Sequence, residues 1–130
     1  MAALIRKRRF PRRRFRRPVG VLIDGNFYVC EGVEVSEGGI MVASTQEIPD
    51  GKRMILTFFV PGATECILRG ESRYSTPPKS DGRRGVGIQF SNVKREQRRM
   101  IRDYISAKTQ TEAAQDMETS QHLAKKNANR

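Results

Sequence analysis

The sequence predicts a mainly β protein: a small six-stranded antiparallel β-barrel followed by one α-helix. Two observations predict the strands: apolar residues recur at period two across residues 18–91, and segments rich in glycine and proline interrupt them at short intervals. A third observation predicts the helix, because residues 92–106 carry an apolar stripe at helical spacing. A closed barrel is favoured over an open sheet because closure removes exposed strand edges.

The first half of the barrel is predicted to hold three strands. Residues 19–23 alternate between apolar and other residues, and the Asp-Gly-Asn segment at residues 24–26 predicts a hairpin turn. Residues 27–33 then form the returning strand. The Ser-Glu-Gly-Gly segment at residues 36–39 predicts a second turn, which leads into a short strand over residues 40–43.

Three further strands complete the predicted barrel. A Pro-Asp-Gly turn precedes residues 54–58, where every second residue is apolar. A Pro-Gly turn then leads into a strand over residues 65–74. Residues 75–84 contain two prolines and a glycine and predict a flexible loop, after which residues 85–90 form the last strand.

The helix predicted over residues 92–106 has one apolar face on an otherwise charged surface. We expect this face to pack on the barrel, and we expect Ser91 or Asn92 to cap the start of the helix. The apolar face consists of Met100, Ile101, Tyr104 and Ile105.

Positive charge is concentrated at the N-terminus. The formal net charge is +11, and nine basic residues with no acidic residue fall within residues 6–17. We therefore predict a flexible basic arm over residues 1–17, the barrel and helix over residues 18–106, and a polar tail over residues 107–130 that is disordered or transiently helical. No apolar run approaches the ~18 residues of a membrane span, and the basic start lacks the apolar region of a secretory signal. A cytoplasmic location is therefore expected.

The residues needed for metal binding or histidine catalysis are nearly absent. The one histidine, His122, lies in the predicted tail, and Cys30 and Cys66 show no Cys-x-x-Cys spacing. We expect both cysteines to be buried, reduced thiols. No metal site, no cofactor and no enzymatic activity are expected.

Three motifs, in this order, resemble those of the PilZ domain family, the bacterial receptor module for cyclic di-GMP. The family pattern is Arg-x-x-x-Arg, then Asp/Asn-x-Ser-x-x-Gly, then a Gly-φ-Gly-φ-x-Phe strand before a helix. This sequence has arginines at Arg13 and Arg17, Glu-Val-Ser-Glu-Gly-Gly at residues 34–39 and Gly-Val-Gly-Ile-Gln-Phe at residues 85–90. The resemblance covers roughly residues 8–106. It implies a PilZ-like barrel that binds cyclic di-GMP.

The arginine motif fits this run in more than one register. We prefer Arg13 with Arg17, because Arg17 directly precedes the predicted first strand, as in the family. The pattern is also met by Arg8 with Arg12, Arg9 with Arg13, and Arg12 with Arg16.

The resemblance implies a ligand-binding role for both polar motifs. An arginine fork can bind a phosphate or guanine O6 and N7, and its flat face can stack on a base. Glu34 stands where the family has Asp or Asn, so it keeps an acceptor for a guanine edge but adds a methylene. The predicted cyclic di-GMP site consists of Arg12, Arg13, Arg14, Arg17, Glu34, Ser36, Gly38 and Gly39.

Other interpretations of these residues remain open. Glu34 can be an ordinary surface residue of a strand, and Ser36 can bond its own turn instead of a ligand. Gly38 and Gly39 are expected to permit positive φ and a close approach of the ligand to the main chain, and a purely structural turn needs the same glycines. Glu37 is expected to point away from an anionic ligand. Residues 73–74, Arg-Tyr, offer a charge and a ring, but such residues often only end a strand, so they stay outside the predicted site.

The functional hypothesis is a receptor whose arm is mobile without ligand and folds over the barrel when cyclic di-GMP binds. That change would alter the surface presented to an unidentified protein partner. Two other classes stay open. The arginine-rich arm could bind nucleic acid with a steep salt dependence, or the domain could bind a protein partner without any nucleotide.

Overall fold

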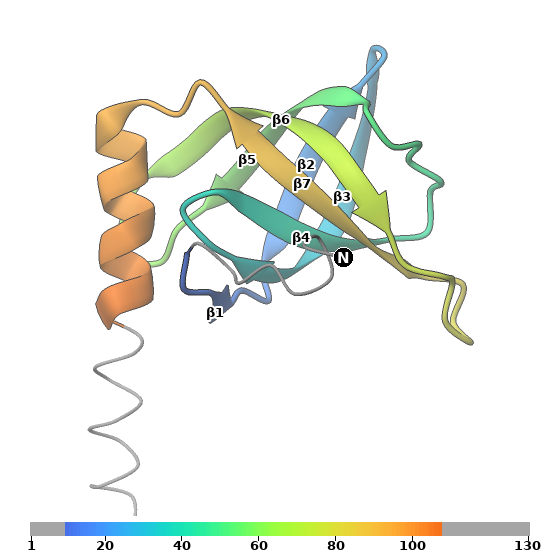
Figure 1. The fold of residues 1–130 in the computed structure, drawn as a ribbon, viewed down its shortest axis with the longest axis horizontal. Helices are drawn as coiled ribbons and strands as arrows, with labels where there is room; N and C mark the ends of the chain where they lie inside the picture. Colours follow the sequence, from blue (N-terminus) through green and yellow to red (C-terminus); the bar gives the residue numbers. More distant parts are fainter. Residues whose placement is uncertain (1–9, 108–130) are drawn as a thin grey trace, which may run out of the picture.

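The computed structural model describes residues 10–107. Six long antiparallel strands form a closed barrel, and the helix at residues 95–107 stands beside one end of it (Figure 1). The predicted fold is therefore confirmed. The strands are β1 Arg13–Arg14, β2 Pro18–Ile23, β3 Asn26–Val35, β4 Gly39–Ser44, β5 Arg53–Phe59, β6 Glu65–Ser75 and β7 Arg84–Ser91.

The barrel closes because every long strand has two neighbours. The strands follow the order β3-β2-β5-β6-β7-β4, and the pairing of β3 with β4 joins the two ends. The register shifts between Gly32 and Glu34 on β3 and between Ser72 and Tyr74 on β6. Irregularities of this kind bend a strand and increase its twist, as closure of a small barrel requires.

The hairpin predicted between the first two long strands is confirmed. Ile23 pairs with Asn26, so only two residues form the loop. Both have positive φ, 50° at Asp24 and 78° at Gly25. This is the conformation of a type I′ turn, whose twist matches that of the flanking strands and which Asp-Gly adopts readily.

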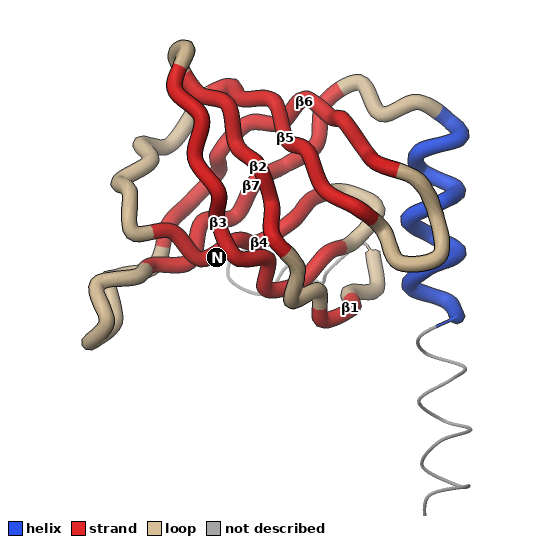
Figure 2. Tube along the Cα trace, turned by 180° about the vertical axis from the view of Figure 1, so that it is seen from behind, coloured by secondary structure: helices blue, strands red, loops and turns tan. Residues whose placement is uncertain are grey.

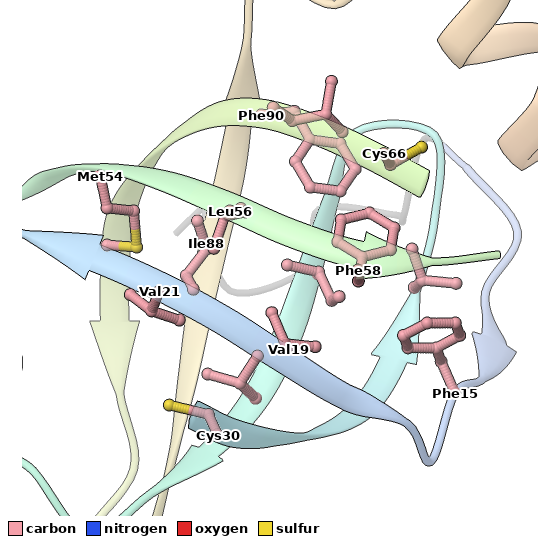
Figure 3. Packing of buried hydrophobic residues seen from close by; sticks show 14 of the residues in the cluster. Phe15, Val19, Val21, Cys30, Met54, Leu56, Phe58, Cys66, Ile88 and Phe90 are labelled. Atoms are coloured by element: carbon pink, nitrogen blue, oxygen red, sulfur yellow. The ribbon is translucent and has the colours of Figure 1, made fainter. Parts of the chain in front are cut away.

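Inward-facing residues of all six long strands fill the barrel (Figure 3). Cys30 and Cys66 are among them, and both are free and buried, as predicted. Burial raises the pKa of both thiols, in the case of Cys66 to about 11.

The N-terminal boundary of the barrel differs from the prediction. The sequence placed residues up to 17 in a flexible arm, but β1 pairs with the end of β3 through Arg13↔Val35 and Arg14↔Glu34. The next side chain, Phe15, is 1% exposed and lies in the core (Figure 3). Residues 13–17 therefore belong to the folded domain. The remaining predictions for the arm and tail fall on residues 1–9 and 108–130, outside the described residues.

The helix starts later than predicted, at residue 95. Ser91 still belongs to β7 and Asn92 has a φ of 52°, so the predicted caps are wrong. Gln97 performs this role instead: its Oε1 accepts a 3.1 Å hydrogen bond from the Lys94 N–H, which is one half of a capping box. Its Nε2 also donates a 3.0 Å bond to the carbonyl oxygen of Ile67 on β6.

The apolar face of the helix packs on the barrel as predicted. Ile101 and Ile105 are buried, and Met100 and Tyr104 pack against the core while partly exposed. Within residues 10–107, no helix has the length and apolar character needed to cross a membrane.

Candidate functional site

A cleft of about 190 Å³ lies where the turn between β3 and β4 meets β6 and β7. It is smaller than the roughly 300–1,000 Å³ of typical small-molecule pockets. It is therefore of a size to hold one part of a dinucleotide, such as a base, while the remainder lies on the surface. Its polar and aromatic lining comes from Arg12, Glu34, Ser36, Arg73, Tyr74 and Gln89.

Arg12 and Glu34 form an ion pair at one side of the cleft. Their Nη1 and Oε1 atoms are 2.5 Å apart, and the side chains are 32% and 29% exposed. β1 brings them together, because its pairing with β3 carries the residues preceding Arg13 towards the end of β3. The carboxylate has lone pairs beyond the one that Arg12 uses, so it can accept a further hydrogen bond.

The turn after β3 is held by Ser36. Its N–H donates a 2.9 Å bond to the Gly39 carbonyl, and its Oγ accepts a 3.2 Å bond from the Gly38 N–H. The Oγ also lies 3.4 Å from the Gly39 carbonyl, to which it donates. In this structure Ser36 thus forms the local turn bonds that are the alternative to a ligand contact.

Of the two glycines of this turn, Gly39 is required, for a reason other than the predicted positive φ. Neither Gly38 nor Gly39 has positive φ. A Cβ on Gly39 would instead lie 2.3 Å from the carbonyl oxygen of Ile88, and one on Gly38 would lie 3.0 Å from the ring of Phe10. Gly39 therefore lets β4 approach β7 closely.

Three predicted arginines lie away from the cleft. Arg13 donates a 2.9 Å hydrogen bond to the Tyr104 carbonyl, and its guanidinium lies 3.6 Å from the centre of the Tyr104 ring. Arg14 is exposed on β1, outside the lining of the cleft. Arg17 borders a separate depression beside β3. The predicted residues that the structure brings together are Arg12, Glu34, Ser36, Gly38 and Gly39.

This arrangement favours another register of the arginine motif. Arg12 belongs to two of the possible registers: its partner is either Arg8, which lies outside the described residues, or Arg16, which lines the same separate depression as Arg17. The Arg13 and Arg17 register preferred from sequence places neither arginine there, since the first contacts the helix and the second lies beside Pro18 and Glu31.

Arg73 and Tyr74 line the cleft although they stand outside the site predicted from sequence. Tyr74 pairs with Gly87 across β6 and β7, and a Cβ on Gly87 would lie only 2.3 Å from Cε1 of the tyrosine. The ring therefore lies flat against a glycine, with 45% of the residue exposed. A glycine inside a strand often marks such a close approach. Gly87 is therefore the feature of the sequence that could have indicated a ring packed at this position.

Glu37 is directed to the helix, in keeping with the expectation that it points away from an anion. Its Oε1 lies 3.0 Å from Nη2 of Arg102, and this contact raises the pKa of Arg102. The turn that borders the cleft is therefore attached to the helix. Residues 10–107 contain no group of histidine, cysteine and acidic side chains able to hold a metal ion.

Comparisons with known proteins point to one family. A family model described as "PilZ domain" matches residues 6–107. Similar solved structures include the Bacillus subtilis inhibitor of motility MotI/DgrA, with a TM-score of 0.74 at 14% identity, over 82% of this chain and 53% of that chain. The PilZ domain of Escherichia coli YcgR with c-di-GMP has a TM-score of 0.66 at 12% identity, over 87% of this chain and 98% of that domain.

A third similar structure is the K. pneumonia MrkH–c-di-GMP complex, with a TM-score of 0.66 at 17% identity, over 86% of this chain and 56% of that chain. The present chain thus spans about half the length of MotI/DgrA and MrkH. Comparison with curated proteins gives no match.

Proposed function

Because the chain belongs to the PilZ domain family, whose model matches residues 6–107, we propose that it is a receptor for cyclic di-GMP. The observation that carries this proposal is the meeting of Arg12 and Glu34 above the Ser36 turn, since these residues come from two separate motifs. The similar structures of YcgR and MrkH with c-di-GMP support the same ligand class.

The cleft offers complementary chemistry for a guanine nucleotide. The Arg12 fork can donate two hydrogen bonds to a phosphate or to guanine O6 and N7. The Glu34 carboxylate can accept from the guanine N–H edge, and the exposed ring of Tyr74 offers a stacking surface. Arg73 adds a positive charge at the rim.

The ion pair between Arg12 and Glu34 would open when ligand binds. Both side chains are about one-third exposed, and a pair of this kind contributes only about 0–1 kcal/mol. A ligand that offers an anion to Arg12 and a donor to Glu34 therefore replaces the pair at little cost. A simple polyanion satisfies Arg12 but leaves Glu34 facing it, so the pair favours a guanine nucleotide over phosphate alone.

We retain the proposed rearrangement of the arm, but over a shorter segment. Residues 13–17 already pair with β3 and bury Phe15, so binding would reposition Arg12 and the residues before it. The altered surface would be recognised by a protein partner, as yet unidentified.

Isothermal calorimetry with cyclic di-GMP, GTP and cyclic di-AMP at moderate salt tests the proposal. We expect cyclic di-GMP to bind most tightly. Arg12→Ala should weaken it about 10-fold or more, because a hydrogen bond to a charged group is worth about 1.5–3 kcal/mol. The matched control is Arg17→Ala, which removes the same charge five residues away and should change affinity less than about 3-fold.

Other results would contradict the proposal. Equal binding of all three nucleotides with a steep salt dependence would indicate attraction of any polyanion and favour nucleic acid. Absence of binding to any of them would favour a protein-interaction domain that uses no nucleotide.

A further inference from the structure

The outer surface of β3, β2, β5 and β6 carries large apolar side chains that remain exposed; we call it the apolar face. Strands of an antiparallel barrel ordinarily place polar residues on the side that faces water. Here six outward-facing residues are apolar: Leu22 (38% exposed), Phe27 (62%), Val29 (67%), Ile55 (40%), Phe59 (60%) and Ile67 (57%).

The strand register joins the central part of the apolar face, while Ile67 and Phe59 at its border pair with Thr57 and Glu65. The four strands lie side by side when the barrel is seen from behind (Figure 2). Leu22 pairs with Phe27 on one side and with Ile55 on the other. In the next row Gly20 pairs with Val29. The ring of Phe27 covers Gly20, since a Cβ on this glycine would lie 2.8 Å from Cζ of Phe27. Contiguous exposed apolar surface of this kind marks an interaction site.

Two opposite charges flank the same surface symmetrically. Glu65 and Arg69 lie two residues before and two residues after Ile67 on β6, so all three side chains point outward. Both charged residues are exposed, and within residues 10–107 neither takes part in an ion pair. Each charge is thus available to a partner that carries the opposite charge at the matching position.

We propose that the apolar face is the interface of a homodimer. The two-fold axis runs perpendicular to the strands at the row of Ile67. It exchanges the residues that come before Ile67 on β6 with those that come after it. Face-to-face packing about this axis sets Glu65 of one copy opposite Arg69 of the other, twice in each dimer. It also sets Phe59 over Ile55, because these residues pair with Glu65 and Arg69 on the neighbouring strand.

A second copy fits this surface better than the end of the same chain does. The segment 108–130 contains only Met117 and Leu123 as large apolar residues, which is too few to cover six. The charge pattern also requires a partner with an acid and a base at mirrored positions, and this chain supplies both. The proposed cleft is bordered by β4, β7 and the C-terminal ends of β3 and β6, whereas the apolar residues of β3 and β6 precede those ends, so the dimer would leave it open.

Sedimentation velocity of the full chain without nucleotide, over a range from low to high micromolar concentration, tests the proposal. We expect a reversible monomer–dimer equilibrium. Glu65→Arg or Arg69→Glu should each raise the dimer Kd about 10-fold or more, because each creates two like-charge contacts. The double variant Glu65→Arg with Arg69→Glu should return the Kd to within about 3-fold of the starting protein.

Glu96→Arg is the matched control, because it makes the same charge change at an exposed position on the helix; it should leave the Kd unchanged. Far-UV circular dichroism confirms that each variant is folded. The proposal is overturned by a protein that stays monomeric at every concentration, by a dimer that neither single variant weakens, or by a double variant that fails to restore association. A monomer that still binds cyclic di-GMP would overturn the dimer alone and leave the proposed receptor intact.

Discussion

Phe15 provides the sharpest test of where the folded domain begins. The sequence places this residue among arginines, whereas the structure buries it to 1% exposure. Its ring forms T-shaped pairs with Phe58, at 5.5 Å between centroids, and with Tyr104, at 6.1 Å. Phe15 thus joins the segment before β2, the barrel core and the helix in one cluster.

The expected loss on replacing Phe15 with alanine follows from that burial. Truncation of a buried phenylalanine typically costs about 3–5 kcal/mol, as lost transfer free energy and a residual cavity. Two edge-to-face contacts of about 0.5–1.5 kcal/mol each are removed by the same change and place this site towards the upper part of that range. Domains of this size unfold with about 5–15 kcal/mol, so about a third of the stability or more would be lost.

Urea unfolding followed by far-UV circular dichroism measures this loss, since the chain has no tryptophan for fluorescence. Phe10→Ala is the control, because it makes the same change in the same segment at a residue that is 36% exposed; it should cost less than about 1 kcal/mol. If Phe15→Ala were no more destabilising than Phe10→Ala, residues 13–17 would not be part of the folded domain, and the reasoning would be refuted.

Two further outcomes follow from the packing. Gly39→Ala should lower the free energy of unfolding by about 1–3 kcal/mol or more, because the added Cβ would meet the Ile88 carbonyl oxygen at 2.3 Å; thermal unfolding measures this, and an unchanged midpoint would contradict it. Stability should also fall above pH about 9, because burial raises the pKa of Cys66 from 9.0 to about 11. The folded state then favours the neutral thiol, so this contribution is complete below the unfolded pKa and is lost as pH rises through the folded one, by at most about 3 kcal/mol. Urea titrations at about pH 8 and pH 10.5 should show a smaller difference for Cys66→Ala than for the starting protein.

The strands could be predicted because each has a single buried side. On β5, for example, Met54, Leu56 and Phe58 face the core while the residues between them face outward. Period-two alternation in the sequence therefore follows directly from a strand whose alternate residues face the core and the outside. The Asp24-Gly25 loop was equally clear, because few sequences adopt positive φ at two successive positions.

β1 was missed because its sequence signal is one residue long. Arg14 and Arg16 are exposed and Phe15 between them is buried, which is strand alternation without a second apolar residue to repeat it. The nine positive charges around Phe15 indicated a flexible arm more strongly than this single buried position indicated a strand. The register of the arginine motif was harder to predict, since several spacings fit. The sequence favoured Arg13 with Arg17, whereas the structure places Arg12 beside Glu34.

Under the proposed function, occupation of the cleft would be sensed through two contacts that connect its borders to the helix. Arg12 contacts Glu34 in the cleft, while the next residue, Arg13, contacts Tyr104 on the helix. Consecutive residues of an extended segment point to opposite sides, so a ligand that moves Arg12 pulls directly on the residue that holds the helix. The turn between β3 and β4, which forms the other border of the cleft, is also connected to the helix, through the ion pair of Glu37 with Arg102. Both walls thus lead to the helix at residues 95–107. A ligand signal would therefore reach a protein partner there, on a surface separate from the apolar face.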